Sequence, residues 1–174
     1  MRGKKAVEWI STVLYVLIGL AIIASLLAII QPEVSRLKDR FIISQTIQSL
    51  DTLDDTIMRA REATGTRLNY IINLEEGTLL IDGAHDKVYW NIISDYKYSE
   101  VNKTVEIGKI KATTLGYGKI WNVTLELGYS AYNINLTVSS KDSNKYLTKS
   151  SLPYSIWIEN RGKQGTNQQI DFSM

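Results

Sequence analysis

Apolar residues are concentrated in one uninterrupted run near the start of the chain. Residues 9–30 contain 13 Leu, Ile and Val among 22 positions and no Asp, Glu, Lys or Arg. As an α-helix rising about 1.5 Å per residue, the run measures roughly 33 Å, enough to cross a hydrocarbon layer of about 30 Å. We therefore expect a transmembrane segment. The alternative, a buried core helix of a soluble protein, rarely extends so far without a charge.

Basic residues precede this run and indicate its orientation. Arg2, Lys4 and Lys5 lie on its N-terminal side, and positively charged flanks favour the cytoplasm. The chain from about residue 31 onward is then expected outside. A cleavable secretory signal fits poorly, because the run exceeds the usual core of about 7–15 residues and no small-residue cleavage site follows Ile30.

Beyond Pro32 the pattern becomes amphipathic. Proline can be carried by a helix as a kink, so the helix is expected to continue with one bend. Apolar residues recur at steps of mostly three or four, with polar residues between them: Val34, Leu37, Phe41, Ile43, Ile47, Leu50, Leu53, Ile57 and Ala60. We expect this stripe to cover the rest of the chain. A solvent-exposed coiled coil is the alternative.

The helix is expected to end near residue 64. Arg59 and Arg61 lie in the last predicted turn, and Gly65 suits the position after it. The pattern thus predicts one helix over residues 4–64, roughly 90 Å long. Its amphipathic part covers residues 31–64, and the domain boundary falls at Gly65.

From Thr66 the period shifts toward two, and β-branched and aromatic residues dominate, as in strands. In one segment Ile120, Asn122, Thr124 and Glu126 alternate with Trp121, Val123, Leu125 and Leu127. Candidate strands are 66–73, 77–83, 87–94, 103–116, 119–128, 132–140, 154–160 and 168–174. We expect 139–145 to be an exposed loop and 161–167 to be a hairpin loop. The fold class is α+β, with a long N-terminal helix and an antiparallel, sandwich-like β-rich domain over 65–174.

Composition excludes several kinds of chemistry. The formal net charge of +2 does not favour a nucleic-acid surface. With no cysteine, disulfides, thiolate metal sites and a Cys nucleophile are excluded, and the single histidine, His85, excludes a His-cluster metal site. His85 lies between Asp82 and Asp86, where a hairpin turn is favoured over a metal loop. We expect no cofactor, no metal and no catalysis.

Two other groups of residues have a structural and a functional interpretation. Three carboxylates lie on the polar face of the predicted helix: Asp51, Asp54 and Asp55. A solvated face is favoured for them, with a catalytic or Ca²⁺ site as the alternative. Three aromatic residues lie close together in the strand region: Trp90, Tyr96 and Tyr98. Packing on a strand face explains them, and a sugar-stacking platform is the alternative.

Three Asn-x-Ser/Thr triplets follow the apolar run. They begin at Asn102, Asn122 and Asn135. Each is a candidate N-glycosylation site, because all three are expected on the outer side, in or beside strands.

The N-terminus resembles an archaeal type IV prepilin with a class III signal peptide. Arg2-Gly3 matches the end of a short basic leader, residues 1–3, and Glu8 is the fifth residue of a mature chain that begins at Lys4. The resemblance implies a processing site between Gly3 and Lys4. A competing cut after Ala6 would move Glu8 out of this position.

The resemblance also implies partners and a mechanism. A prepilin peptidase would remove the leader, and an assembly ATPase and a platform protein would draw the mature helices from the membrane into a filament of like subunits. Glu8 would offset the new N-terminal ammonium in the filament core. Small or adaptable surfaces for close helix contacts are Tyr15, Gly19, Ala21, Ala24, Ser25 and Ala28. The β-domain would form the outer shell, and the filament would serve adhesion or surface attachment.

Two further functions stay open. An uncleaved single-pass protein would use its β-domain to bind a sugar, a cell-wall layer or a partner chain. A membrane-tethered enzyme or chaperone is less favoured, because few catalytic residue types are present.

Overall fold

The chain forms two compact units in a computed structural model, one up to Lys38 and one from Asp39 to Met174. The structure describes the backbone of residues 2–118 and 120–174, with the side chains at 2–8, 11 and 117 left aside. A single helix, α1 (Arg2–Arg61), passes through Pro32. The expected long helix is therefore present, and its last 23 residues, 39–61, belong to the second unit.

The helix ends three residues earlier than predicted, at Arg61. Asn160 explains the position of this end, because its amide Nδ2 donates to the carbonyls of Ala60 at 2.9 Å and Arg61 at 3.1 Å. Carbonyls of the last turn have no partner within the helix, so these bonds satisfy two of them. Gly65 adopts a left-handed φ of 85° in the turn that follows, and its N–H donates to the Asn160 carbonyl at 2.8 Å.

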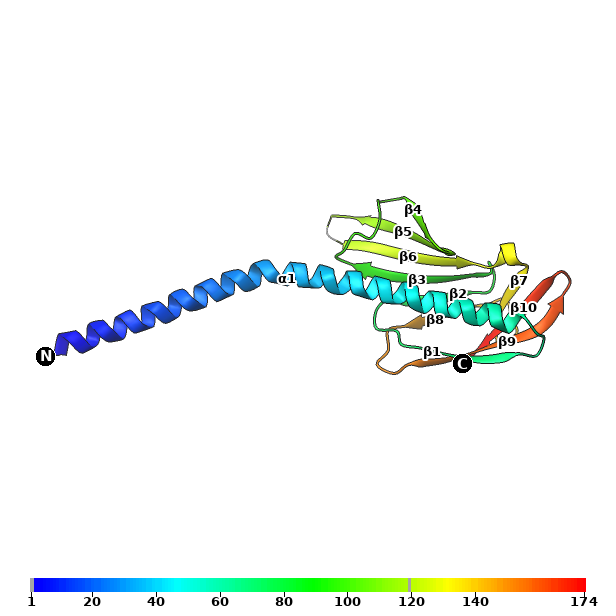
Figure 1. The fold of residues 1–174 in the computed structure, drawn as a ribbon, viewed down its shortest axis with the longest axis horizontal. Helices are drawn as coiled ribbons and strands as arrows, with labels where there is room; N and C mark the ends of the chain where they lie inside the picture. The colour runs from blue at the N-terminus through cyan, green and yellow to red at the C-terminus, as the bar shows by residue number, and fades with distance from the viewer. Residues whose placement is uncertain (1, 119) are drawn as a thin grey trace. The chain divides into compact units, whose positions relative to one another are not determined.

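After α1, the described residues of the second unit form ten strands in two sheets (Figure 1). The first five are β1 (Arg67–Ile72), β2 (Thr78–Asp82), β3 (Lys87–Ser94), β4 (Thr104–Ile107) and β5 (Ile110–Tyr117). The others are β6 (Ile120–Gly128), β7 (Ile134–Val138), β8 (Asn144–Thr148), β9 (Tyr154–Gln164) and β10 (Asn167–Ser173), with a short 3₁₀ turn, η1 (Ser130–Tyr132), before β7. One sheet has the order β1-β9-β10-β7 and the other β4-β5-β6-β3-β2-β8. The expected α+β fold with a β-rich domain is confirmed.

Strand pairing departs from the prediction in one place. Every pair is antiparallel except β10 with β7, which run parallel, so the four-stranded sheet is mixed. β8 and β9 lie between β7 and β10 in the chain. This long connection makes a parallel pair possible, since parallel neighbours cannot be joined by a tight turn.

Three predicted segments are corrected. The single strand expected over 103–116 is a hairpin, because Gly108 adopts a φ of 60° and reverses the chain between β4 and β5. The loop expected over 139–145 is present over 139–143, but a strand that was not predicted, β8, begins at Asn144, pairs with β2 at the sheet edge and buries Leu147. The hairpin loop expected over 161–167 is mostly strand, because β9 and β10 pair up to Gln164 and Asn167.

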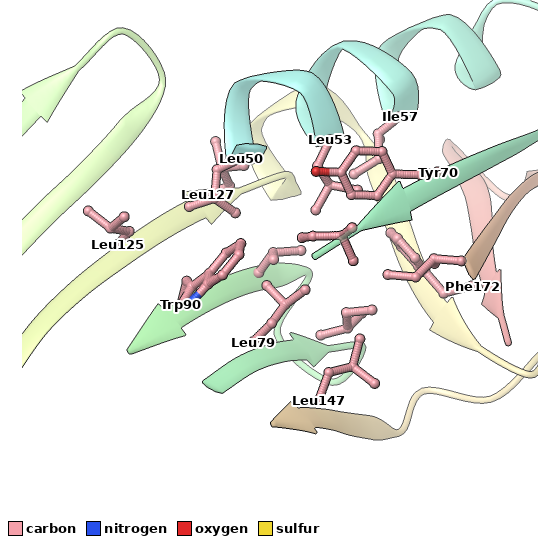
Figure 2. Close-up of a cluster of buried hydrophobic side chains, with 14 of the residues drawn as sticks. Leu50, Leu53, Ile57, Tyr70, Leu79, Trp90, Leu125, Leu127, Leu147 and Phe172 are labelled. Carbon is pink, nitrogen blue, oxygen red and sulfur yellow. The ribbon is translucent and has the colours of Figure 1, made fainter. Parts of the chain in front are cut away.

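The core of the second unit lies between α1 and the two sheets. Figure 2 shows Leu50, Leu53 and Ile57 of the helix directed toward side chains of the strands. All three are fully buried. The buried strand residues drawn around them are Tyr70, Leu79, Trp90, Leu125, Leu127, Leu147 and Phe172. Burying each large side chain stabilises the fold by about 1.5–3 kcal/mol, so this face of α1 contributes much of the core.

The predicted apolar stripe is in fact two stripes on different faces of α1. Five of its residues form the buried stripe, which contacts the sheets: Ile43, Leu50, Leu53, Ile57 and Ala60. Phe41, in contrast, is 68% exposed, and Val34 and Leu37 are exposed as well. The step from Phe41 to Ile43 is two residues, about 200° around the helix, so the two residues face opposite ways. The expectation that the whole stripe covers the β-domain is therefore wrong for Phe41, which belongs to the second unit.

We predict that alanine substitutions on the two faces of α1 change stability by very different amounts. Ile57→Ala leaves a cavity in the core and should lower the free energy of unfolding by about 2–5 kcal/mol. Phe41→Ala removes an exposed ring and should change it by less than about 0.5 kcal/mol. Urea denaturation of the full chain in a mild detergent measures both values, and equal losses would contradict the two-stripe description.

Candidate membrane helix and surface sites

The large apolar side chains of the run are exposed wherever they are described. The described large hydrophobic side chains from Trp9 to Ile30 are between 44% and 76% exposed. Contiguous apolar surface of this size is unfavourable in water and marks a lipid or protein contact. By length and composition α1 is able to cross a membrane, and none of its apolar window is buried inside the chain. This segment is therefore not a buried core helix.

Polar side chains inside the run are few, and one of them is satisfied within the helix. The Ser25 hydroxyl donates to the Ala21 carbonyl, one turn earlier, at 2.8 Å. Such a bond leaves no unpaired hydroxyl facing hydrocarbon. At Gly19 an added Cβ would meet no atom within 4 Å, so this side of the helix is open to close approach by another helix.

The proposed processing residues have a helical backbone, but their side chains lie outside the described part. This applies to Gly3, Lys4 and Glu8. Cleavage after Gly3 and charge pairing by Glu8 therefore stay predictions.

Polar contacts fix the second half of α1 to the strands. At its start, one carboxylate oxygen of Asp39 accepts the Asp95 N–H at 2.6 Å and the Ser94 hydroxyl at 3.2 Å. In the middle, the Tyr70 hydroxyl donates to the Ser49 carbonyl at 2.7 Å. Together with Asn160 at the end, these bonds set the position of the helix along the sheets.

The carboxylates of the helix do not all lie on a solvated face. Asp51 and Asp55 are exposed, but the Asp54 side chain is only 8% exposed and binds Lys109 of the β4–β5 turn at 2.6 Å. The expectation of a solvated face is therefore wrong for Asp54. Its position is explained by the ion pair, because a buried charge is tolerated when a counterion reaches it. Among the described residues, no group of three or more His, Asp and Glu could hold a metal ion.

Charge and burial around Asp54 change neighbouring pKa values. The hydrogen bond to Asp54 raises the pKa of Lys109. Burial, followed by the negative charge of Asp54, raises the pKa of Tyr129 well above its ordinary value. The second Asp54 oxygen and the Tyr129 hydroxyl are both buried without a hydrogen-bond partner in the described structure. The ion pair is thus the main polar link between this part of α1 and the turn.

His85 is part of a hairpin turn, as predicted. It lies between β2 and β3, and its Nδ1 is 2.9 Å from a carboxylate oxygen of Asp82. The next residue, Asp86, has a φ of 55°, and its carboxylate accepts the Leu136 N–H at 2.8 Å. These contacts close the turn and attach it to β7.

The aromatic residues considered as a platform are not on one surface. Trp90 is 2% exposed, and its indole N–H donates to the Glu76 carbonyl at 3.0 Å, so it belongs to the core. Tyr96 and Tyr98 are half-buried against that core. A sugar platform that includes Trp90 is therefore wrong. One surface hollow of about 390 Å³ remains beside the β4 edge, lined by Tyr98, Ser99, Glu100, Lys103, Thr104 and Val105.

The three glycosylation candidates differ in accessibility. Asn102 is exposed in a turn with a φ of 60°, and Asn122 is exposed on β6. Asn135 is half-buried on β7, and the hydroxyl of its triplet residue Thr137 is buried and donates to Asp171 at 2.7 Å. In the folded chain, Asn102 and Asn122 are the accessible acceptors.

Strand register reveals a polar row that the sequence analysis missed. One Thr or Asn from each strand of the six-stranded sheet lies in a single line across it: Thr148, Thr78, Asn91, Thr124, Thr113 and Thr104. The Thr124 hydroxyl donates to Asn91 at 2.8 Å. None of these side chains is fully buried, so the row lies on the outer face, beside Asn122. Only pairing brings these residues together, because they are scattered over 71 positions of the chain.

Comparisons with family models, with curated proteins and with solved structures returned no match to this chain. The functional conclusion therefore depends on the residues and geometry described above.

The Asp54–Lys109 pair predicts an asymmetric response to mutation. Lys109→Ala leaves a buried carboxylate without its cation and should lower the free energy of unfolding by about 3 kcal/mol. Asp54→Asn leaves Lys109, whose side chain is 43% exposed and stays hydrated, and should cost only about 1 kcal/mol. Lys111→Ala, at an exposed lysine two residues later on β5, is the matched control. Urea denaturation measures the three, and a larger loss for Asp54→Asn would overturn this account.

Tyr70 predicts a loss of stability at high pH. Burial raises the pKa of its hydroxyl to about 12, above the ordinary value of 10. The neutral phenol is therefore favoured by folding, and the stabilisation is complete below about pH 10 and lost between about pH 10 and 12. Tyr70→Phe should cost about 1 kcal/mol at neutral pH through the lost hydrogen bond, and should make the alkaline loss smaller. Unfolding at about pH 8 and about pH 11 compares the two chains.

Proposed function

We propose that this chain is a structural subunit of an extracellular type IV pilus-like filament. In this proposal the apolar half of α1 packs in the filament core and the β-domain forms its surface. The observation that carries the proposal is an uncharged run, residues 9–30, whose described large apolar side chains are exposed and whose helix continues without a break into a folded β-rich domain. Glu8 at the entrance to this run, together with Gly3, distinguishes it from an ordinary anchor.

The chemistry of assembly follows from the charges. Cleavage after Gly3 creates an ammonium group on Lys4, five residues inclusive from the Glu8 carboxylate. A charge in a dry core is tolerated only when it is paired, so Glu8 would offset this ammonium within its own subunit or on a neighbour. The apolar run would lie first in lipid and then among copies of itself.

The connection between the run and the domain also supports a filament subunit. An anchored receptor commonly carries a flexible linker outside the membrane, rich in Gly, Ser or Pro. Here residues 31–61 are helical instead. Repeated head-to-tail contacts between such subunits are open and generate a helical filament.

The partners follow from this proposal. They are other copies of the chain or related pilins, a prepilin peptidase, an assembly ATPase and a platform protein. The precursor would lie in the cell membrane with its N-terminus in the cytoplasm, and the assembled subunit at the cell surface, for adhesion or attachment. Asn102 and Asn122 would carry any glycan on the outside, and no nucleic acid or cofactor is assigned.

A second candidate is an uncleaved, membrane-anchored binding protein. The hollow beside β4 favours it, because Tyr98 offers an aromatic surface beside the ion pair of Lys103 with Glu100. In that case the β-domain would be an ectodomain that binds a sugar or a partner chain, and Glu8 would have no assigned role.

The N-terminus of the native protein separates the two. We expect intact mass and N-terminal sequencing of material from its own envelope to give a chain that begins at Lys4. Filaments should then be visible by electron microscopy in the sheared fraction. Glu8→Gln should be cleaved normally but should abolish filaments, because the ammonium loses its partner.

Glu62→Gln, an exposed carboxylate just past the end of α1, is the matched control and should assemble normally. A chain that still begins at Met1 and is released only by detergent would reject the filament and favour the anchored binding protein.

A further inference from the structure

The exposed face of α1 carries an unbroken heptad repeat. Its steps alternate between three and four residues over nine positions, here called the exposed seam: Trp9, Val13, Val16, Leu20, Ile23, Leu27, Ile30, Val34 and Leu37. Each of these side chains is between 44% and 76% exposed. A period of 3.5 residues is the spacing at which two helices keep the same face in contact along a left-handed supercoil.

The seam continues beyond the uncharged run. Between residues 31 and 38 the neighbouring positions are polar, charged or proline, and the large apolar side chains are Val34 and Leu37. Lipid explains apolar residues up to Ile30 on every face, but it does not explain a narrow stripe after charges begin at Glu33. Covering such a stripe with another surface removes it from water and lowers the free energy.

The β-domain of the same chain does not cover this face where the second unit begins. Phe41, the next position of the repeat, is 68% exposed, whereas Ile43 is fully buried. The buried stripe therefore lies on a different face of α1 from Phe41, and an occupant of the seam packs on the other face of the helix.

Charges beside the seam indicate what that occupant is. With Val34 at heptad position a and Leu37 at d, Glu33 falls at g and Lys38 at e. In a parallel pair of helices in register, the g residue of one chain lies beside the e residue five positions later on its partner. Glu33 and Lys38 have this spacing and opposite charges. Pro32 falls at f, the position farthest from the seam, where its ring obstructs no partner.

We propose that two copies of this chain associate in parallel and in register through the seam, with Glu33 of each copy beside Lys38 of the other. Glu33 binds Arg36 of its own helix at 2.9 Å in the single chain, with both side chains more than half exposed. A surface pair of this kind contributes little, so Glu33 is able to exchange partners at small cost. This pairing does not depend on the proposed filament, because a membrane-anchored chain would present the same seam.

Cysteine cross-linking tests the contact directly, because the chain contains no cysteine. Val34→Cys and Leu37→Cys place a thiol in the seam, and Ser35→Cys, at position b, is the matched control on the same turn. Mild copper-catalysed oxidation of native membranes is expected to give a disulfide-linked dimer at least tenfold more abundant for the two seam variants than for the control. A disulfide needs Cβ atoms about 3.5–4.5 Å apart, which same-position pairs reach only in register.

Charge exchange tests the orientation. In the Leu37→Cys background, Glu33→Lys or Lys38→Glu alone places like charges opposite each other and should reduce the dimer several-fold. The double variant, Glu33→Lys with Lys38→Glu, restores opposite charges and should restore it. Each variant is compared at an equal amount of the protein in the membrane.

The outcomes are separable from those of the filament proposal. No same-position dimer at Val34 and Leu37, or equal dimer at Ser35, would overturn the paired helices even if filaments form. A staggered filament core would give disulfides only in mixtures of cysteines at different positions, and this result would overturn the in-register pair as well. Seam dimers in a chain that keeps Met1 would leave the pair standing and reject the filament.

Discussion

The second unit depends on the burial of one face of α1 between two sheets. Leu50, Leu53 and Ile57 are buried over the strands and are directed toward their side chains (Figure 2). Two sheets of four and six strands have inner faces that need an apolar cover, and the helix supplies it for both. The sandwich is therefore not complete without residues 42–60, although these belong to the same helix as the membrane-length run.

This constraint explains where polar groups are allowed inside. A helix held in one rotational position needs specific contacts as well as apolar packing, because hydrophobic burial alone has no direction. Four groups of α1 bind residues from different strands or turns: Asp39, the Ser49 carbonyl, Asp54 and the helix end. The buried Asp54 thus helps to fix the position of α1, and its charge is tolerated because Lys109 pairs with it.

The same helix serves two environments by changing its apolar face. Up to Phe41 the apolar positions follow a heptad, and from Ile43 they follow the face that the sheets bury. The two-residue step from Phe41 to Ile43 therefore separates two faces of α1. One face packs in the core of the second unit, and the other is available to lipid or to other subunits. The proposed filament and the proposed helix pair both use the first face, and neither requires the domain to unfold.

Local patterns in the sequence determined much of this architecture. The uncharged run, the continuous helix, the strand over 87–94 and the turn at His85 follow from periodicity and turn residues, which act between near neighbours. Other features depend on residues far apart in the chain. Asp54 is buried because Lys109 lies against it, β8 forms because β2 presents an edge, and the Thr and Asn row exists only in the paired register. Sequence spacing alone does not separate the two apolar stripes for the same reason. Spacing gives the direction of a side chain, but only the packed structure decides which direction is covered.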